Sequence, residues 1–189
     1  MKPETVTQQF RASQDVIGKS SDALAAPVAA AGDALIECLQ SGGKIICFGN
    51  GGSATQANHL AEELVGRFRA DRRSLPAISL SSDGATLTCI GNDFGFGALF
   101  ERQVEAYAQR GDVVVGLTTS GKSENVIRGL RAAGSRGLTT IALCGSRGLA
   151  DGEVDHLVCV PGEDSAQIQE IHLMILHAWC RAIDDAFKD

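Results

Sequence analysis

The chain has 189 residues, of which 44% are hydrophobic and 21% are charged, and this balance is typical of one soluble globular domain. Its net charge of −6 excludes a generally basic surface, so nucleic acid is not an expected partner. Segment 1–10 lacks the apolar stretch of a secretory signal, and no apolar run approaches the ~18 residues of a membrane span. We therefore expect a cytoplasmic protein with no membrane partner.

The N-terminal segment 4–41 is expected to form two helices. The second, from Ser21 to Gln40, carries apolar side chains at helical spacing and stops at Gly42-Gly43. Beyond it, short apolar runs alternate with helical patterns. The runs predict strands at 44–48, 75–80, 112–117, 139–144 and 155–160, the last nearer an edge, and the patterns predict helices at about 53–68, 84–91, 96–109, 123–135 and 165–186.

Continuous apolar strands separated by helices indicate a parallel sheet that is covered on both faces. With right-handed crossovers, the predicted fold class is α/β, a three-layer, doubly wound sandwich with a five-stranded, mostly parallel sheet. We expect a single domain over residues 1–189, with the apolar helices of 1–41 as an extension that packs in an oligomer. Ligands of such folds bind beyond the carboxyl ends of the strands. This rule selects the loops 49–54, 81–84, 118–124 and 145–149.

The six cysteines include no Cys-x-x-Cys pair. Cys47, Cys144 and Cys159 lie within apolar, strand-like runs. We interpret the cysteines as small buried hydrophobic residues in a reducing compartment, rather than as a disulfide framework or a zinc knuckle.

The loop at 49–54, Gly-Asn-Gly-Gly-Ser-Ala, joins a predicted strand to a predicted helix. Its glycines allow close approach of the backbone to a ligand, and the Ser53 hydroxyl and the helix N-terminus suit an anion such as phosphate. A dinucleotide fingerprint is a weaker interpretation, because no acidic residue ends the next strand at the required spacing. Taken alone, this loop is equally well explained as a tight turn without a ligand.

The loop at 118–125, Thr-Thr-Ser-Gly-Lys-Ser-Glu-Asn, combines four hydroxyl groups, a glycine and the start of a helix. Neutral donors beside a helix N-terminus form a phosphate cradle, and the Walker A pattern is absent. Ser123 by itself is explained as a helix N-cap, but four hydroxyl groups exceed what a cap requires. We therefore favour a phosphate site here.

His59 and Glu63 lie one turn apart on the helix after the first loop, so they share a face. They can form a solvated surface pair, a metal half-site or an acid–base unit, and spacing alone favours the surface pair. The last predicted helix has a mostly apolar centre that includes Gln169, His172 and His177. We expect His172 to be a core histidine bonded to the backbone, an explanation that suits Gln169 and His177 less well.

Taken together, five segments resemble the sugar isomerase (SIS) domain family, and within it the sedoheptulose-7-phosphate isomerases. The resemblance covers essentially the whole chain. It rests on GNGGS at 49–53, HLAEELVGRF at 59–68, IGNDFGF at 90–96, TTSGKSEN at 118–125 and IQEIHLMILH at 168–177.

The resemblance implies an aldose–ketose isomerase that converts sedoheptulose 7-phosphate to D-glycero-D-manno-heptose 7-phosphate, with Glu63 and His177 as catalytic acid–base residues. It also implies a homotetramer with shared active sites. Some members carry zinc, one ion per subunit, at the positions of His59, Glu63, Gln169 and His177. The implied substrate ligands are Asn50, Gly51, Gly52, Ser53, Glu63, Asn92, Asp93, Thr118, Thr119, Ser120, Ser123 and Gln169, and the phosphate lies among Ser53 and the hydroxyl groups of 118–123.

Two positions depart from the family pattern, because Gln167 stands where many relatives have arginine and Thr118 where serine is commoner. Two other functions compete with the heptose isomerase. A non-catalytic SIS adaptor that binds the replication initiator would lack acid–base residues at the positions of Glu63 and His177. Another phosphosugar isomerase is disfavoured by the IQEIHLMILH segment.

Overall fold

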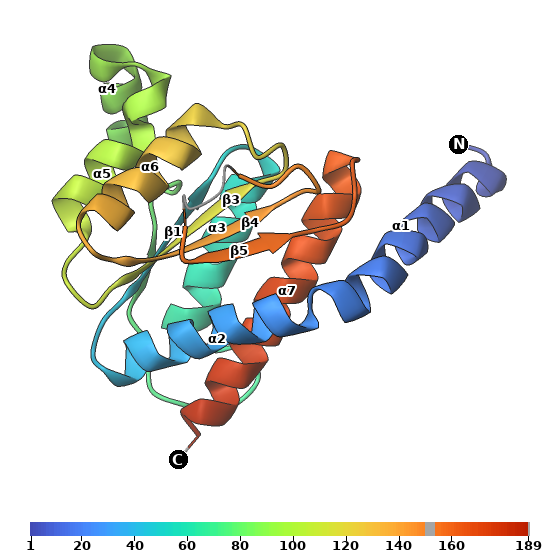
Figure 1. The fold of residues 1–189 in the computed structure, drawn as a ribbon, viewed down its shortest axis with the longest axis horizontal. Helices are drawn as coiled ribbons and strands as arrows, with labels where there is room; N and C mark the ends of the chain where they lie inside the picture. The colour runs from blue at the N-terminus through green and yellow to red at the C-terminus, as the bar shows by residue number, and fades with distance from the viewer. Residues whose placement is uncertain (150–153, 189) are drawn as a thin grey trace.

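The structure is a computed structural model that describes residues 1–149 and 154–188. Over these residues, a five-stranded sheet lies between two layers of helices (Figure 1), and its strand order is β2-β1-β3-β4-β5. All described strand pairs are parallel, and β5 lies at an edge, which confirms the predicted α/β class. In chain order the elements are α1 (Pro3–Ala23), α2 (Ala25–Gln40), β1 (Ile45–Gly49), α3 (Gly52–Val65), β2 (Ala77–Ser79), α4 (Gly84–Phe94), the 3₁₀ turn η1 (Phe96–Ala98), α5 (Leu99–Tyr107), β3 (Val113–Thr118), α6 (Glu124–Ser135), β4 (Thr139–Cys144), β5 (His156–Cys159) and α7 (Ser165–Ala186).

The alternation of side chains along the strands divides the core into two layers. Val115 and Leu117 of β3 face α2, α3 and α7, whereas Val114 faces α5 and α6. Because successive side chains of a strand point to opposite faces, burial on both faces requires an unbroken apolar run. This explains why the sequence located β1, β3 and β4 well.

The first two helices meet at a different residue than the sequence pattern predicted. We expected the second helix to begin at Ser21, but α1 continues to Ala23 and α2 begins at Ala25. Pro27 has no N–H to donate to the carbonyl of Ala23, and its ring disfavours a continuous helix across that point. The chain therefore bends at Leu24, and α1 extends away from the sheet (Figure 1).

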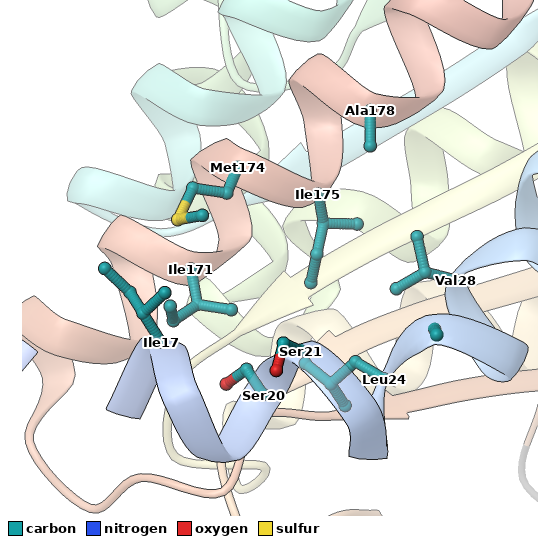
Figure 2. Close-up of a pocket in the computed structure, with 10 residues that line it drawn as sticks. Ile17, Ser20, Ser21, Leu24, Val28, Ile171, Met174, Ile175 and Ala178 are labelled. Atoms are coloured by element: carbon teal, nitrogen blue, oxygen red, sulfur yellow. The ribbon is translucent and has the colours of Figure 1, made fainter. Parts of the chain in front are cut away.

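A groove of about 190 Å³ runs between the α1–α2 bend and α7 (Figure 2). Its lining is mostly apolar, and it includes Met174 and Ile17, which are 50% and 38% exposed. The groove is therefore an exposed apolar feature that lies on the extension predicted to pack in an oligomer.

None of the helices in the described part of the chain is long and apolar enough to cross a membrane.

Candidate active site

Helices α3 and α7 bring three chemically competent side chains together. His59 Nε2 on α3 lies 3.1 Å from His177 Nε2 on α7 and 3.5 Å from Glu63 Oε1. Each residue offers one potential ligand atom, and these three atoms all lie within 4.8 Å of one another. All three residues are half-buried. The structure thus joins the acid–base residues predicted from opposite ends of the sequence, and it excludes an isolated surface pair for His59 and Glu63.

Neighbouring side chains orient this cluster. The carboxylate of Glu62 lies 3.3 Å from His59 Nδ1, so a proton on Nδ1 leaves the Nε2 lone pair facing Glu63 and His177. The Phe68 ring stacks on His177 at 5.3 Å between centroids, and the Arg69 guanidinium lies 5.3 Å from the Phe68 centroid. Sequence reasoning gave no role to Glu62 or Phe68, although both belong to the HLAEELVGRF segment.

The donor set of the cluster fits zinc. Two imidazoles and one carboxylate are common zinc ligands, and bonds of about 2.0–2.1 Å in a tetrahedron separate ligand atoms by about 3.3–3.4 Å. The 3.1 and 3.5 Å separations around His59 Nε2 bracket this spacing. The fourth predicted ligand, Gln169, does not join this cluster within one chain. Its amide packs against Gly52 at the start of α3, within 2.8 Å of where a Cβ on Gly52 would lie. Gly52 precedes His59 by about 10 Å of helix rise, so the metal role of Gln169 stays a prediction.

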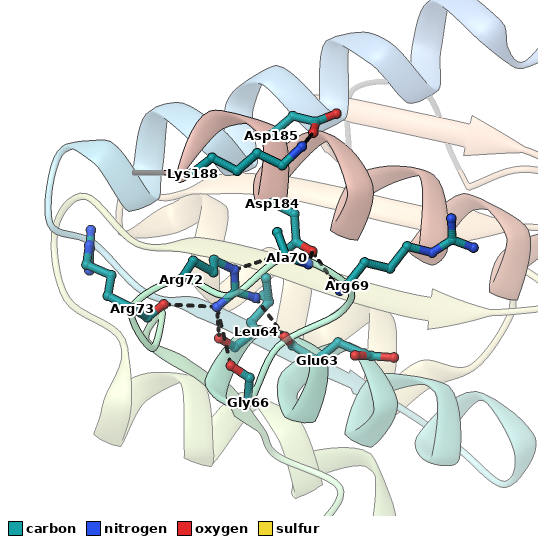
Figure 3. Close-up of polar contacts among 10 residues, drawn as sticks. All are labelled: Glu63, Leu64, Gly66, Arg69, Ala70, Arg72, Arg73, Asp184, Asp185 and Lys188. Atoms are coloured by element: carbon teal, nitrogen blue, oxygen red, sulfur yellow. Dashed lines mark hydrogen bonds and ion pairs between the residues drawn. The ribbon is translucent and has the colours of Figure 1, made fainter.

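A buried ion pair fixes α3 relative to α7 (Figure 3). Arg72 donates from Nε to Asp184 of α7 at 2.8 Å, and from its terminal nitrogens to the carbonyls of Glu63 and Leu64 at the end of α3. Asp184 also accepts from the backbone N–H groups of Arg69 and Ala70. Burial alone would raise the pKa of Asp184, but these N–H donors and the guanidinium together hold the pKa below its usual value. The pair therefore holds in register the two helices that carry the cluster.

The first glycine-rich loop follows the carboxyl end of β1, as predicted, and lines a pocket of about 530 Å³. Asn50 and Gly51 line this pocket, and the Asn50 amide exchanges two hydrogen bonds of 2.8 Å with Asn125 of α6. Gly51 has a φ of +53°, a conformation that glycine adopts without strain. Ser53 is buried in the first turn of α3, where the position of a Cβ on Gly49 would lie 2.7 Å from it. Asn125 is thus a buried partner of the predicted sugar site that sequence reasoning missed.

Asn92 and Asp93 were expected in a loop, but α4 extends through both of them. The two side chains are exposed, bond to each other at 2.7 Å, and lie outside the lining of the 530 Å³ pocket. Their backbone is helical because Asp83 caps α4, and the helix ends only at Gly95, whose φ is +83°. Within one chain, the structure therefore does not bring these residues to the other predicted sugar ligands.

The hydroxyl groups of the loop at 118–125, the hydroxyl-rich loop, lie close together at the start of α6. Thr118 donates to Ser123 Oγ at 3.0 Å, and Ser120 Oγ accepts from the backbone N–H of Lys122. Ser123 occupies the N-cap position of α6 without a side-chain cap bond, so the cap explanation does not account for its hydroxyl. Thr119 Oγ1 lies 3.2 Å from Ser165 Oγ at the start of α7, which adds a hydroxyl that the sequence motif does not contain.

Comparison with known protein families shows which family this chain belongs to. A family model described as the SIS domain matches residues 8–145. The chain belongs to the SIS domain family.

Within the SIS family, this chain is similar to phosphoheptose isomerases along nearly its whole length. It is 44% identical to the phosphoheptose isomerase of Campylobacter jejuni over 172 residues, which cover 90% of this chain and 92% of that one. It is 52% identical to that of a Nitratiruptor species over 80% of this chain and 82% of that one. A solved phosphoheptose isomerase from Francisella tularensis superposes with a TM-score of 0.92, at 34% identity, over 98% of this chain and 100% of that one. The predicted branch of the SIS family is therefore confirmed.

Proposed function

We propose that this SIS protein is a sedoheptulose-7-phosphate isomerase that forms D-glycero-D-manno-heptose 7-phosphate by a shift of the carbonyl between C2 and C1. The observation that carries the proposal is the meeting of Glu63 with His177 in one half-buried cluster. Similarity to phosphoheptose isomerases of several bacteria supports the substrate. A non-catalytic adaptor has no need of such a carboxylate–imidazole pair.

The slow step of this reaction is removal of a proton from carbon beside a carbonyl group. In our mechanism, the Glu63 carboxylate removes a proton from C1 of the ketose and returns it to C2 of the resulting enediol. His177 donates a proton to O2 as the enediol forms and accepts the O1 proton as the aldehyde forms. Each positioned acid or base contributes about 10²–10⁴-fold to the rate.

The loops at 49–54 and 118–125, which follow the carboxyl ends of β1 and β3, would position the rest of the substrate. We assign the 7-phosphate to the hydroxyl groups of Thr118, Thr119, Ser120 and Ser123, which supply neutral donors at the start of α6. Asn50, held by Asn125, and Gly52, covered by Gln169, would contact the sugar hydroxyl groups. These contacts supply orientation rather than chemistry.

Zinc is the metal that this site would hold, with His59, Glu63 and His177 as ligands; within one chain the Gln169 amide lies too far from these three to complete the set. When bound, it would polarise the substrate carbonyl. The same carboxylate would then serve as a ligand and as the proposed base. Metal analysis of the purified protein, and activity before and after dialysis against a chelator, would decide whether zinc is required.

We further propose a homotetramer in which the apolar groove of Figure 2 is covered by a second copy. Met174 and Ala178 line this groove, and they also line a depression that contains His177, so a copy seated here would adjoin the catalytic cluster. Light scattering should give a tetramer for wild type and a smaller species for Met174→Lys, whereas Tyr107→Lys, on the opposite face of the sheet, should remain tetrameric.

The decisive experiment follows the reaction in D₂O with sedoheptulose 7-phosphate. Wild type should form the aldose with deuterium at C2, and Glu63→Gln and His177→Ala should not. Glu105→Gln, an exposed carboxylate variant on α5, should behave as wild type. Near-normal turnover in both site variants would refute the mechanism, and an inert wild type that binds a replication protein would favour the adaptor. We also propose that the enzyme works in a reducing cytoplasm, where buried cysteines such as Cys38, Cys47 and Cys180 serve as small hydrophobic residues.

A further inference from the structure

Two cysteines that lie 15 positions apart in the sequence, Cys144 and Cys159, are neighbours in the sheet. Cys144 ends β4, Cys159 ends β5, and the two residues are direct register partners. Their Sγ atoms lie 3.4 Å apart. Neighbouring strands place partner Cα atoms about 4.8 Å apart, which lies within the 4.4–6.8 Å range of disulfides. Small rotations of both side chains would therefore suffice to join the two sulfur atoms.

The two thiols differ in exposure. Cys144 is fully buried, whereas Cys159 is half-buried at the edge strand. Burial, and then the adjacent Cys159 thiol, raise the pKa of Cys144. Cys38, Cys47 and Cys180 are buried as well and their pKa values are raised to about 11–12, so they are poor thiolate sources. An external oxidant would thus meet Cys159 before Cys144.

We propose that Cys144 and Cys159 are a redox-sensitive dithiol that closes to a disulfide and alters the hydroxyl-rich loop. The oxidant is a low-molecular-weight disulfide such as oxidised glutathione. The Cys159 thiolate attacks one of its sulfur atoms, forms a mixed disulfide and releases one thiolate. Cys144 then loses its proton, attacks the Cys159 sulfur and expels the second thiolate, which takes up that proton. Two protein thiols are oxidised, and one external disulfide is reduced to two thiols.

Backbone contacts connect this dithiol to the hydroxyl-rich loop. The N–H of Gly145, the residue after Cys144, donates to the carbonyl of Thr119 at 3.1 Å. The position of a Cβ on Gly148 lies 3.4 Å from Cys159 Sγ, and the Gly148 carbonyl packs so closely on Gly121 that a Cβ there would lie 2.0 Å from it. Movement of the Cys159 sulfur toward Cys144 would therefore displace Gly145 and Gly148, the residues that contact Thr119 and Gly121.

A second contact links the dithiol to α7. His172 Nε2 lies 3.3 Å from the carbonyl of Cys144, and this carbonyl also accepts from the N–H of Val160 at 2.9 Å. Cys144 is thus tied to β5 and α7 through its backbone, while its Sγ, which also donates to the carbonyl of Val158 at 3.6 Å, already lies beside Cys159 Sγ. We expect the disulfide to form without unfolding, and to act locally, through Gly145 and Gly148, on the hydroxyl-rich loop that follows β3.

The test treats native wild-type protein with oxidised glutathione and maps the product by mass spectrometry. Trypsin cuts after Arg136, Arg147 and Arg181, so Cys144 and Cys159 fall on different peptides. Wild type should lose two hydrogens, link peptide 137–147 to peptide 148–181 through Cys159, and recover with dithiothreitol. Cys144→Ser should stop at the mixed disulfide on Cys159, and Cys159→Ser should remain unmodified at Cys144. Cys89→Ser, which removes an exposed thiol on α4, should still form the link.

A mixed disulfide that persists on Cys159 of wild type, or a link that involves Cys180 instead, would overturn the proposed dithiol. The effect on the hydroxyl-rich loop rests on the proposed function. Oxidised wild type should show a KM for sedoheptulose 7-phosphate raised about tenfold with kcat little changed, as expected for the loss of about one hydrogen bond between this loop and the substrate. An unchanged KM in fully oxidised protein would refute the coupling. If wild type showed no isomerase activity at all, the proposed function would fail, while peptide mapping would still decide the dithiol.

Discussion

Replacement of Asp184 by alanine is expected to destabilise the protein strongly, because it leaves the buried guanidinium of Arg72 without its counter-charge. The side chains of Arg72 and Asp184 are 1% and 3% exposed, and they meet at 2.8 Å. The variant also removes the acceptor for the backbone N–H groups of Arg69 and Ala70. Both losses fall on the segment between α3 and β2, where this segment contacts α7.

The magnitude follows from the burial of the pair. Removal of one partner of a buried ion pair costs about 3–5 kcal/mol, because the remaining charge stays desolvated. Arg72 keeps its hydrogen bonds to the carbonyls of Glu63, Leu64 and Arg73, which places the expected cost toward the lower end of this range. For a chain of this length, the loss corresponds to a fall in Tm of about 6–20 °C.

Urea and thermal unfolding of the two proteins at equal protein concentration would measure this loss. The matched control is Asp185→Ala, since Asp185 of α7 pairs with Lys188, which lies just beyond the end of α7, and both side chains are more than half exposed. An exposed pair contributes less than about 1 kcal/mol. Equal unfolding midpoints for Asp184→Ala and Asp185→Ala would refute the reasoning.

The pH dependence provides a second check on the same pair. The folded-state pKa of Asp184 is lowered, so its contribution is fully present above the unfolded-state value of about 3.9 and is lost as the pH falls through the folded value. The stability gap between wild type and Asp184→Ala should therefore be constant near pH 7 and narrow only below about pH 4. A gap that closed between pH 7 and 5 would contradict this assignment.

Three further outcomes are expected. The burial of His172 lowers its pKa to about 4 from 6.5, so wild type should lose about 3 kcal/mol of unfolding free energy between pH 6.5 and 4, and urea titration of His172→Gln should lack this step. Gly129→Ala places a Cβ 2.8 Å from the Phe48 ring, which should cost about 1–3 kcal/mol in urea unfolding, and an unchanged midpoint would refute this overpacking. Gly52→Ala should displace the Gln169 amide, lowering kcat/KM for sedoheptulose 7-phosphate with little change in Tm, and full activity would contradict a role for that contact.

The errors in the predicted elements have local causes. β2 is shorter than the apolar run 75–80, because Pro76 has no N–H to donate to a strand ladder. The break at Leu24 reflects Pro27, which the helical spacing of apolar residues does not register. Both errors come from backbone hydrogen bonding, which hydrophobic periodicity describes only indirectly.

The candidate site divides in a similar way. Helical spacing places His59 and Glu63 on one face of α3, and glycine and hydroxyl composition identifies the loops at 49–54 and 118–124. Neither feature gives the distance from α3 to His177, which lies 118 positions after His59 and was assigned by family resemblance. The contacts of Asn125, Phe68 and Ser165 were missed for the same reason, because each partner lies on a different element.

The sequence by itself determined the α/β class, the parallel sheet and the loops that carry polar groups, because these depend on periodicity and on residue types close together in the chain. Tertiary structure alone decided that Glu63 meets His177, that the Arg72–Asp184 pair joins the end of α3 to α7, and that Cys144 lies beside Cys159. These contacts depend on strand order and on the packing of α7 against α3, which are set by the summed burial of many side chains rather than by any local pattern.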